Sequence, residues 1–299
     1  MRKAIERLTA NYTSPKDGEP FYYLGVALKA QGKPDEAFDA FYKATWSEAW
    51  RGPAYYSLAE IATRRGDFSS ALDYVNRSLD ANALNIRALN LKTALFRHTN
   101  RKQEAIAVLN AAHEIDPLDV RAMAERWLAT DKQEAGELTT TLRHWANTGL
   151  ETATEYGDAG LWQDGVAILT LLTDRGHRAE LVSYRSDPQF TGAVDATAGL
   201  VEDYYLGQFE ERLGDLKGAD VCRQLAMMAA PAPAFPFQWQ AIHVLRHAME
   251  LNPKDAKAPY LLGNLLYDWQ PEEATRVWEQ SAALDPSNPI VHRNLAVAY

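Results

Sequence analysis

Two histidines four residues apart, His243 and His247, have the spacing that comes nearest to a metal site in this sequence. On a helix they would lie on one face, where two imidazoles can bind one metal ion. A zinc site needs three or four ligands, and the sequence shows neither a glutamate between the two histidines nor a third ligand. We therefore expect no metal site here and interpret the pair as an exposed helix face.

The other side chains capable of catalysis occur in patterns that favour structural roles. Cys222 is the one cysteine, and it has no histidine nearby in the sequence to activate it, so we expect a buried, unreactive thiol. The segment from Gly25 to Lys33 lacks the spacing of a phosphate-binding loop, and no G-x-S-x-G element occurs. Three acidic pairs stand near predicted helix starts, where the helix dipole favours negative charge. These pairs are Asp35–Glu36, Glu202–Asp203 and Glu272–Glu273. The sequence therefore predicts a protein that is not an enzyme and that has no cofactor.

Charge and hydropathy narrow the range of partners. The chain of 299 residues has 40 acidic and 31 basic residues, a formal net charge of −9. This charge repels phosphate backbones and anionic lipids, and the sequence has no segregated basic patch. The N-terminus lacks the apolar core of a signal peptide, and no stretch approaches the roughly 20 apolar residues that span a bilayer. We expect a cytoplasmic protein without nucleic-acid or membrane partners.

The elements that carry these residues become visible when the sequence is compared with itself at an offset of 34 residues. Each of three consecutive units is typical of two amphipathic helices around a turn, and in the first unit we expect helices over about 20–30 and 34–46. Gly32, Gly66 and Asn100 mark the turns between the paired helices. Small and large residues recur in register as Ala37, Ala71 and Ala105, each followed four residues later by Phe41, Val75 and Leu109.

The repeat pattern divides the chain into three parts. We predict regular repeats over 1–129, divergent helical repeats over 130–233 and a truncated set of repeats over 234–299. Within the middle part, residues 130–148 are interpreted as one shifted helix with Leu138, Leu142 and Trp145 on its apolar side, and residues 180–197 as a loop. Alternate prolines over 229–236 forbid a helix, which indicates an extended hinge.

These units resemble tetratricopeptide repeats, and this resemblance implies an all-α superhelix, an α-solenoid of antiparallel helix pairs. The order of the repeat motifs is similar to that of large bacterial proteins in which a β-rich, mutarotase-like N-terminal domain of unknown function precedes a tetratricopeptide region. The residues that carry this resemblance include Phe41–Trp46, Ser78–Asn82, Ala159–Trp162, Asn252–Ala256 and Leu262–Asp268.

The resemblance and the physics of stacked repeats give one leading function and two alternatives. Stacked repeats form an extended concave surface without a closed catalytic pocket, which favours a non-enzymatic scaffold for protein or peptide partners. The alternative is an accessory repeat tail of a carbohydrate-active bacterial enzyme whose catalytic domain is absent here. A third interpretation is direct carbohydrate binding by an aromatic groove. It draws on tyrosine pairs in which one ring is expected in the core and the other on the concave face. These pairs are Tyr22–Tyr23, Tyr55–Tyr56 and Tyr204–Tyr205.

The residue patterns at both ends of the chain indicate ends of a solenoid that lack polar capping helices. Residues 2–11 have the pattern of a second helix with no first helix before it, and Tyr299 falls in a first helix with no second helix after it. Uncapped repeats expose apolar surface. We therefore expect the chain to be a piece of a longer protein and to associate with itself through these ends.

The C-terminal repeats contain the best candidate for a binding site. Known peptide-clamping tetratricopeptide domains are similar in placing asparagines where Asn264 and Asn294 stand, and an amide can both donate to and accept from a peptide backbone. Tyr260 stands where those domains have lysine. We predict a groove for an extended peptide segment, including one from the same polypeptide, lined by Tyr260, Asn264, Tyr267 and Asn294. The alternative is that both asparagines are general repeat consensus without a ligand.

Overall fold

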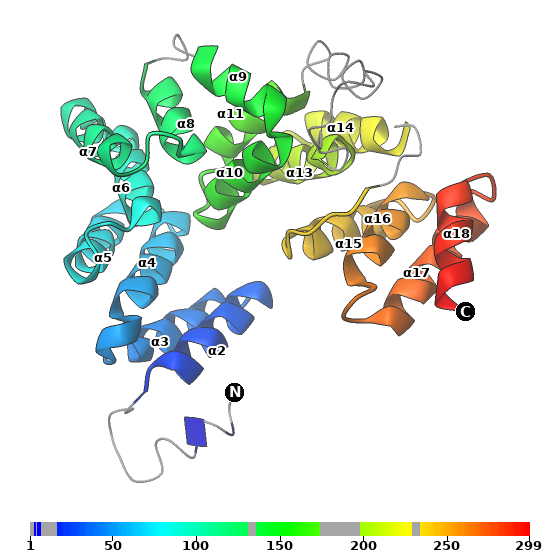
Figure 1. Cartoon of the computed structure of the whole chain (residues 1–299), viewed down its shortest axis with the longest axis horizontal. Coiled ribbons are helices and arrows are strands. Elements are labelled where there is room, and N and C mark those ends of the chain that lie inside the picture. Colours follow the sequence, from blue (N-terminus) through cyan, green and yellow to red (C-terminus); the bar gives the residue numbers. More distant parts are fainter. Residues whose placement is uncertain (1–2, 4, 7–16, 131–135, 174–197, 229–233) are drawn as a thin grey trace. The chain divides into compact units, whose positions relative to one another are not determined.

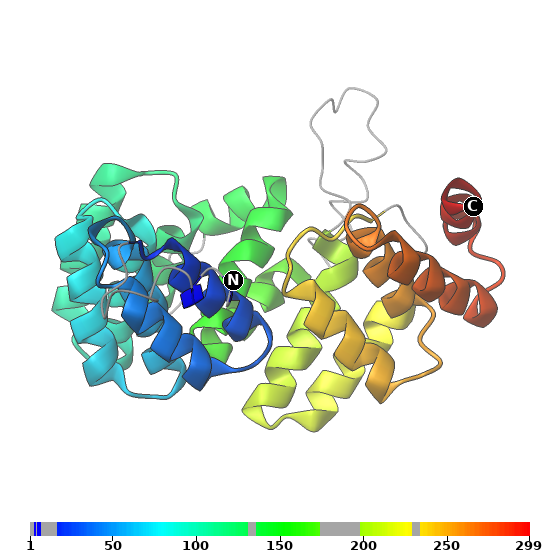
Figure 2. The same cartoon turned by 90° about the horizontal axis from the view of Figure 1, so that it is seen from below.

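The computed structural model is built from helices joined by turns, and its element order can be followed in Figures 1 and 2. It describes residues 3, 5–6, 17–130, 136–173, 198–228 and 234–299. No strand occurs in these ranges. The helices of the first part are α2 (Glu19–Ala30), α3 (Pro34–Ala44), α4 (Glu48–Arg64), α5 (Phe68–Ala81), α6 (Ile86–His98), α7 (Lys102–Ile115), α8 (Val120–Ala129) and α9 (Gly136–His144). The remaining helices are α10 (Ala146–Asp158), α11 (Trp162–Thr173), α13 (Ala198–Leu213), α14 (Leu216–Met228), α15 (Ala241–Leu251), α16 (Lys257–Leu266), α17 (Pro271–Leu284) and α18 (Pro289–Ala298). The all-α fold of antiparallel helix pairs predicted from the sequence is confirmed.

The turns between paired helices use left-handed backbone at the predicted positions. Gly32 has a φ of 70° and Gly66 a φ of 75°, and glycine adopts this conformation without steric cost. Asn100 takes the same role with a φ of 58°, because asparagine tolerates the left-handed region better than most residues. The next helix begins with a side-chain cap where the sequence allows one, as at Asp67, which accepts a hydrogen bond from the amide of Ser70.

The described residues form two compact units. Unit 1 comprises residues 1–138 with 158–161, and unit 2 comprises residues 139–157 with 162–299. The division of the sequence at residues 129 and 233 stays a prediction. Among the described residues, every helix is either too short or too polar for a bilayer span.

In unit 1, the repeat register reflects close approach between paired helices. A Cβ atom added to Gly25 in α2 would lie 2.6 Å from the ring of Phe41 in α3, so only glycine lets that ring pack against the helix. Ala37, Ala71 and Ala105 have no exposed surface, and Val75 has none either. Because interiors are packed at crystal-like density, the small residue and its large neighbour define each pair together.

The middle of the chain departs from two of the predictions. The segment expected as one helix over 130–148 contains α9, which ends at His144, and α10, which begins at Ala146. Leu138 and Leu142 are buried as expected, but Trp145 lies between the helices with 63% of its surface exposed. The break lets each helix turn its own apolar side inward, which one straight helix could not do for all of these residues. Residues 131–135, the predicted loop over 180–197 and the hinge residues 229–233 lie outside the described ranges.

The tyrosine pairs also differ from one another. Tyr23 is 43% exposed beside a half-buried Tyr22, as the pattern predicts. Tyr204 and Tyr205 in α13 are both 1% exposed, so neither ring is free for a ligand. The hydroxyl of Tyr204 donates to Oδ2 of Asp255 over 2.8 Å, which satisfies its polar end inside unit 2.

Candidate functional site

In unit 2, α16 and α18 bring the two predicted asparagines into direct contact. Nδ2 of Asn294 donates to Oδ1 of Asn264 over 2.8 Å. The same oxygen accepts a hydrogen bond from Nε1 of Trp278 at 3.1 Å. Oδ1 of Asn294 in turn accepts from the guanidinium of Arg293 at 3.0 Å. Both acceptor positions of the Asn264 oxygen are therefore used, and the amide nitrogen is left as its donor toward other groups.

Trp278 of α17 is a member of this cluster that the sequence analysis did not single out as a site residue. In the sequence Trp278 occupies the large apolar position of its repeat, which indicates core packing and no polar role. The residue is indeed 3% exposed. The indole Nε1 also donates to the carbonyl oxygen of Tyr260 at 3.2 Å. Tyr267 joins the cluster through this ring, because the two ring centroids lie 5.0 Å apart. A Cβ atom on Gly263 would collide with Trp278, so glycine is required beneath the indole.

The cluster holds the main chain of Ala234, which precedes α15. The amide of Ala234 donates to the hydroxyl of Tyr260 over 3.3 Å. Nδ2 of Asn264 donates to the carbonyl oxygen of Ala234 over 2.5 Å. Tyr260 and Asn264 lie one turn apart on α16, which places their polar ends side by side. Two side chains therefore bind both backbone groups of one residue.

The electrostatics of the cluster suit neutral main chain. Burial raises the pKa of the Tyr260 phenol, so the hydroxyl stays protonated around neutral pH. Lys257, which the sequence places near the site, is only 7% exposed, and burial lowers its pKa despite the nearby carboxylates of Asp285 and Asp255. Arg293 contacts Asn294. The hydrogen-bonding groups that reach Ala234 are thus an amide and a phenol, both neutral, which suit the uncharged N–H and C=O groups of a main chain.

The histidine pair takes part in structural contacts. Nε2 of His247 lies 3.0 Å from Oε1 of Glu211, and the other oxygen of Glu211 accepts from Arg223 at 2.9 Å. Burial pushes the pKa of Glu211 upward, but His247 and Arg223 hold it below its ordinary value. The ring of His243 meets Trp239 edge to face at 6.2 Å. No group of three His, Cys, Asp or Glu side chains able to hold a metal ion occurs within the described ranges.

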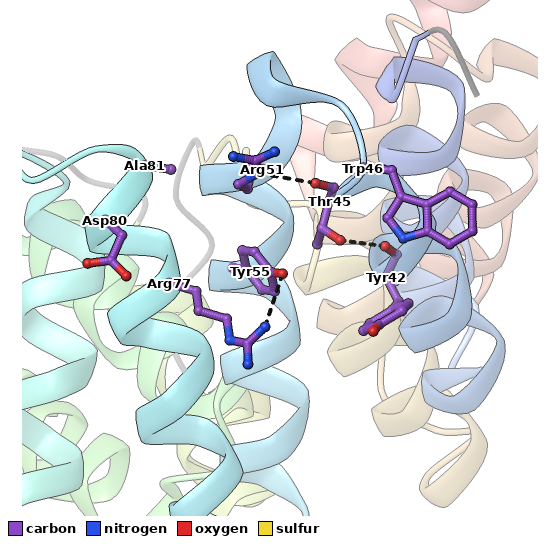
Figure 3. A pocket seen from close by; sticks show the side chains of 8 residues that line it. All are labelled: Tyr42, Thr45, Trp46, Arg51, Tyr55, Arg77, Asp80 and Ala81. Atoms are coloured by element: carbon purple, nitrogen blue, oxygen red, sulfur yellow. Dashed lines mark hydrogen bonds between the residues drawn. The ribbon is translucent and has the colours of Figure 1, made fainter. Parts of the chain in front are cut away.

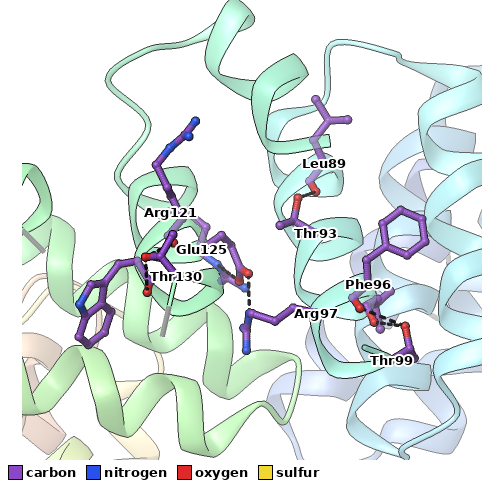
Figure 4. A network of polar contacts seen from close by, with 11 residues as sticks. Leu89, Thr93, Phe96, Arg97, Thr99, Arg121, Glu125 and Thr130 are labelled. Carbon is purple, nitrogen blue, oxygen red and sulfur yellow. Dashed lines mark hydrogen bonds and ion pairs between the residues drawn. The ribbon is translucent and has the colours of Figure 1, made fainter. Parts of the chain in front are cut away.

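Unit 1 contains buried ion pairs that the sequence analysis missed. Glu125 of α8 is fully buried, and Figure 4 shows it between Arg97 of α6 and Arg121 of its own helix. The Nε atoms of these arginines lie 3.2 Å and 3.6 Å from the carboxylate oxygens. This network occupies the carboxylate and its basic neighbours, which favours a structural role.

A second buried carboxylate is held in the same way. Oε2 of Glu60 in α4 lies 2.8 Å from Nζ of Lys29 in α2, and Oε1 lies 4.0 Å from Arg87 in α6. Burial raises the pKa of Glu60, but Lys29 and Arg87 lower it by a larger amount. The pKa of Glu60 therefore lies below its ordinary value. Glu60 and Glu125 occupy different positions of the repeat, and self-comparison of the sequence therefore had no means of finding them.

An open pocket of about 500 Å³ lies among the ends of α3, α4 and α5 in unit 1 (Figure 3). Arg77 binds the hydroxyl of Tyr55 at 3.5 Å and the carboxylate of Asp73 at 2.9 Å. Nε of Arg51 donates to the carbonyl oxygen of Thr45 at 3.4 Å. The pocket is lined by Tyr42, Thr45, Trp46, Arg51, Tyr55, Arg77, Asp80 and Ala81. Aromatic rings beside charges of both signs suit a neutral polar ligand better than an anion.

Comparison with known proteins identifies relatives over parts of the chain. The tetratricopeptide repeat family matches residues 2–53 and 56–120. The photosystem I assembly protein Ycf3 of Rippkaea orientalis is 30% identical over 120 residues, which cover 37% of this chain and 69% of the relative. Ycf3 of Cyanophora paradoxa is 30% identical over 93 residues, which cover 30% of this chain and 53% of the relative.

Two solved structures are similar along most of the chain. A tetratricopeptide repeat protein from Parabacteroides merdae is 13% identical with a TM-score of 0.38, and the match covers 94% of this chain and 98% of the other. Yeast Tom70 is 12% identical with a TM-score of 0.30, and the match covers 94% of this chain and 65% of Tom70.

Proposed function

Because the chain belongs to the tetratricopeptide-repeat family, we propose that it is a non-enzymatic scaffold that binds an extended peptide segment at Tyr260, Asn264, Tyr267 and Asn294. One observation carries the proposal: α16 already holds the backbone amide and the backbone carbonyl of one residue, Ala234. Both hydrogen bonds involve main-chain groups that every residue other than proline offers. A site of this kind binds by backbone geometry and leaves most side chains of the partner free to vary.

The rigidity of the cluster supports the same role. Trp278 and Asn294 fix the Asn264 amide from two sides, so its Nδ2 group is aimed before a ligand arrives. A group that is positioned in advance loses little conformational entropy on binding. The relatives named for photosystem I assembly support a role in bringing protein chains together.

A peptide library titrated into the whole chain tests this function. We expect Asn264→Ala to weaken the selected peptides by about tenfold, because a hydrogen bond to the peptide carbonyl and the support of Asn294 are both lost. Asn294→Ala should weaken them less. Asn110→Ala, at an exposed position of α7, is the matched control and should leave the affinity unchanged. Peptides that bind all four proteins equally would refute the site.

A second candidate function is an accessory role in a carbohydrate-active protein, which the resemblance of the repeat order implies. The pocket among α3, α4 and α5 favours it, because Trp46 and Tyr42 are 49% and 46% exposed beside Arg51 and Asp80. Exposed rings can stack on the apolar face of a sugar while the polar groups bind hydroxyls. Oligosaccharides titrated into the chain and into Trp46→Ala, followed by tryptophan fluorescence, test it. Equal responses from both proteins would count against this role.

A further inference from the structure

We propose that residues 234–238 are a resident ligand of the site on α16, and that a partner peptide binds there by displacing them. This proposal rests on the peptide-binding function proposed above and specifies its ligand. The site takes a chain in extended conformation. Such a chain has a small residue at the clamped position and, two positions later, a residue without a backbone N–H that would require an acceptor. In the resident segment these residues are Ala234 and Pro236.

The first argument is the fit at the clamped position. Ala234 has no exposed surface, while its amide and carbonyl are bound by Tyr260 and Asn264. A side chain much larger than a methyl group has no room there without displacing its neighbours. The position therefore selects alanine or glycine in any ligand that replaces the segment.

The second argument is the alternation of burial along the segment. Ala234, Pro236 and Gln238 are buried, whereas Phe235 and Phe237 are 55% and 53% exposed. A period of two is the signature of extended backbone, in which successive side chains point to opposite sides. One side of the segment is thus seated on unit 2, and the other presents aromatic rings outward. Proline at 236 fits this arrangement because it carries no amide that would need an acceptor.

The third argument is that the resident segment is an imperfect ligand. Nε2 of Gln238 is buried and has no hydrogen-bond partner among the residues that the structure describes. A buried donor without a partner weakens the state that buries it. A free peptide with an apolar residue at this position avoids that penalty, which compensates in part for the advantage that a tethered segment has through its high effective concentration.

The test uses a fluorescent peptide with the sequence of residues 232–239, titrated into the whole chain. In the wild type the site is filled, so we expect weak binding. Ala234→Glu introduces a side chain that cannot enter the buried position, and the vacated site should then bind the peptide about tenfold more tightly. Adding Asn264→Ala to that variant should abolish the gain. Phe235→Glu, at the neighbouring exposed position, is the matched control and should bind like the wild type.

A second variant keeps the test valid if Ala234→Glu does not fold. Gln238→Leu removes the unpaired donor and should seat the segment more firmly, so the peptide should bind less tightly than to the wild type. Hydrogen exchange of the Ala234 amide should slow in this variant and accelerate in Tyr260→Phe, which lacks the accepting hydroxyl.

The outcomes separate this proposal from the one on which it rests. One outcome would overturn the resident ligand and leave the peptide site standing. In that outcome, library peptides bind in a manner that depends on Asn264. The fluorescent peptide, however, binds Ala234→Glu no more tightly and Gln238→Leu no less tightly than the wild type. Failure of every peptide to bind the wild type and both variants would overturn the peptide site, and the resident ligand with it.

Discussion

Asn264 and Asn294 are thirty residues apart in the chain, and their side-chain amides are joined by a hydrogen bond of 2.8 Å. This bond links α16 to α18 through polar atoms, next to the apolar contact of Tyr267 with Trp278. Its consequence is that the donor of Asn264 points at the backbone of Ala234, so one interaction both stabilises the repeat stack and orients the site.

The first prediction concerns this pair. Asn264→Ala should lower the free energy of unfolding by about 1–3 kcal/mol, because it leaves Nε1 of Trp278 and the amide of Asn294 without the shared acceptor. Asn294→Ala should cost less, and the double variant should cost less than the sum of the two. Urea unfolding of the four proteins measures this coupling. Additive effects would show that the two amides act independently.

The second prediction concerns the repeat register. Ala71→Trp should destabilise unit 1 by roughly 1–3 kcal/mol or more, because Ala71 has no exposed surface and a large ring there overpacks the contact between α4 and α5. Ser69→Trp places the same side chain at an exposed position of the same helix and should cost little. The melting temperatures of both variants provide the comparison. Equal melting temperatures would mean that the small position is not required.

The third prediction concerns the dependence of stability on pH. Lys29 and Arg87 lower the pKa of Glu60 below its unfolded value of 4.5 by more than burial raises it. A carboxyl group whose pKa is lower in the folded state stabilises the fold above the unfolded pKa, and this stabilisation is lost as the pH falls through the folded pKa. The wild type should therefore lose stability in urea unfolding between pH 5 and pH 3 (about the range in which glutamate titrates).

Removing the charge of Lys29 should reverse the contribution of Glu60 to the dependence of stability on pH. Lys29→Met leaves a buried carboxylate with less compensation and should cost about 3–5 kcal/mol at pH 7. Protonation of Glu60 relieves the unpaired charge, so the difference from the wild type should shrink in acid. Lys33→Met, which removes an exposed lysine, is the control and should change stability little at any pH. A difference in the free energy of unfolding between Lys29→Met and the wild type that does not change with pH would contradict the role of the pair.

The fourth prediction concerns Cys222. Burial, together with Asp203 and Glu210, raises the pKa of its thiol to about 11. Since the thiolate is the reactive form, only about one molecule in ten thousand carries it at pH 7. Iodoacetamide should therefore modify the folded chain far more slowly than the chain in urea. Equal rates in the two conditions would show that the thiol is not protected.

The sequence by itself determined the repeat architecture, because every feature that defines it is local. Gly32, Gly66 and Asn100 end helices through their own backbone preferences, and Ala71 with Val75 marks a helix contact within one unit. In a solenoid each repeat packs on its sequence neighbours, so spacing along the chain is nearly equivalent to spacing in the fold. The two asparagines of the predicted site were singled out by their resemblance to positions in peptide-clamping repeats, which a repeat register makes comparable.

The tertiary structure decided what no repeat encodes. Ala234 belongs to an irregular segment, and its seat on Tyr260 and Asn264 depends on a surface that α16, α17 and α18 form only after they have packed together. The partners of Glu60, Lys29 and Arg87, come from two other helices. Trp278 gains its polar role because Asn264 and the carbonyl oxygen of Tyr260 lie beside its indole. Each of these contacts is specified by the positions of side chains in space. A sequence pattern reports residue type and spacing, which determine the helices but not the identity of the groups that meet between them.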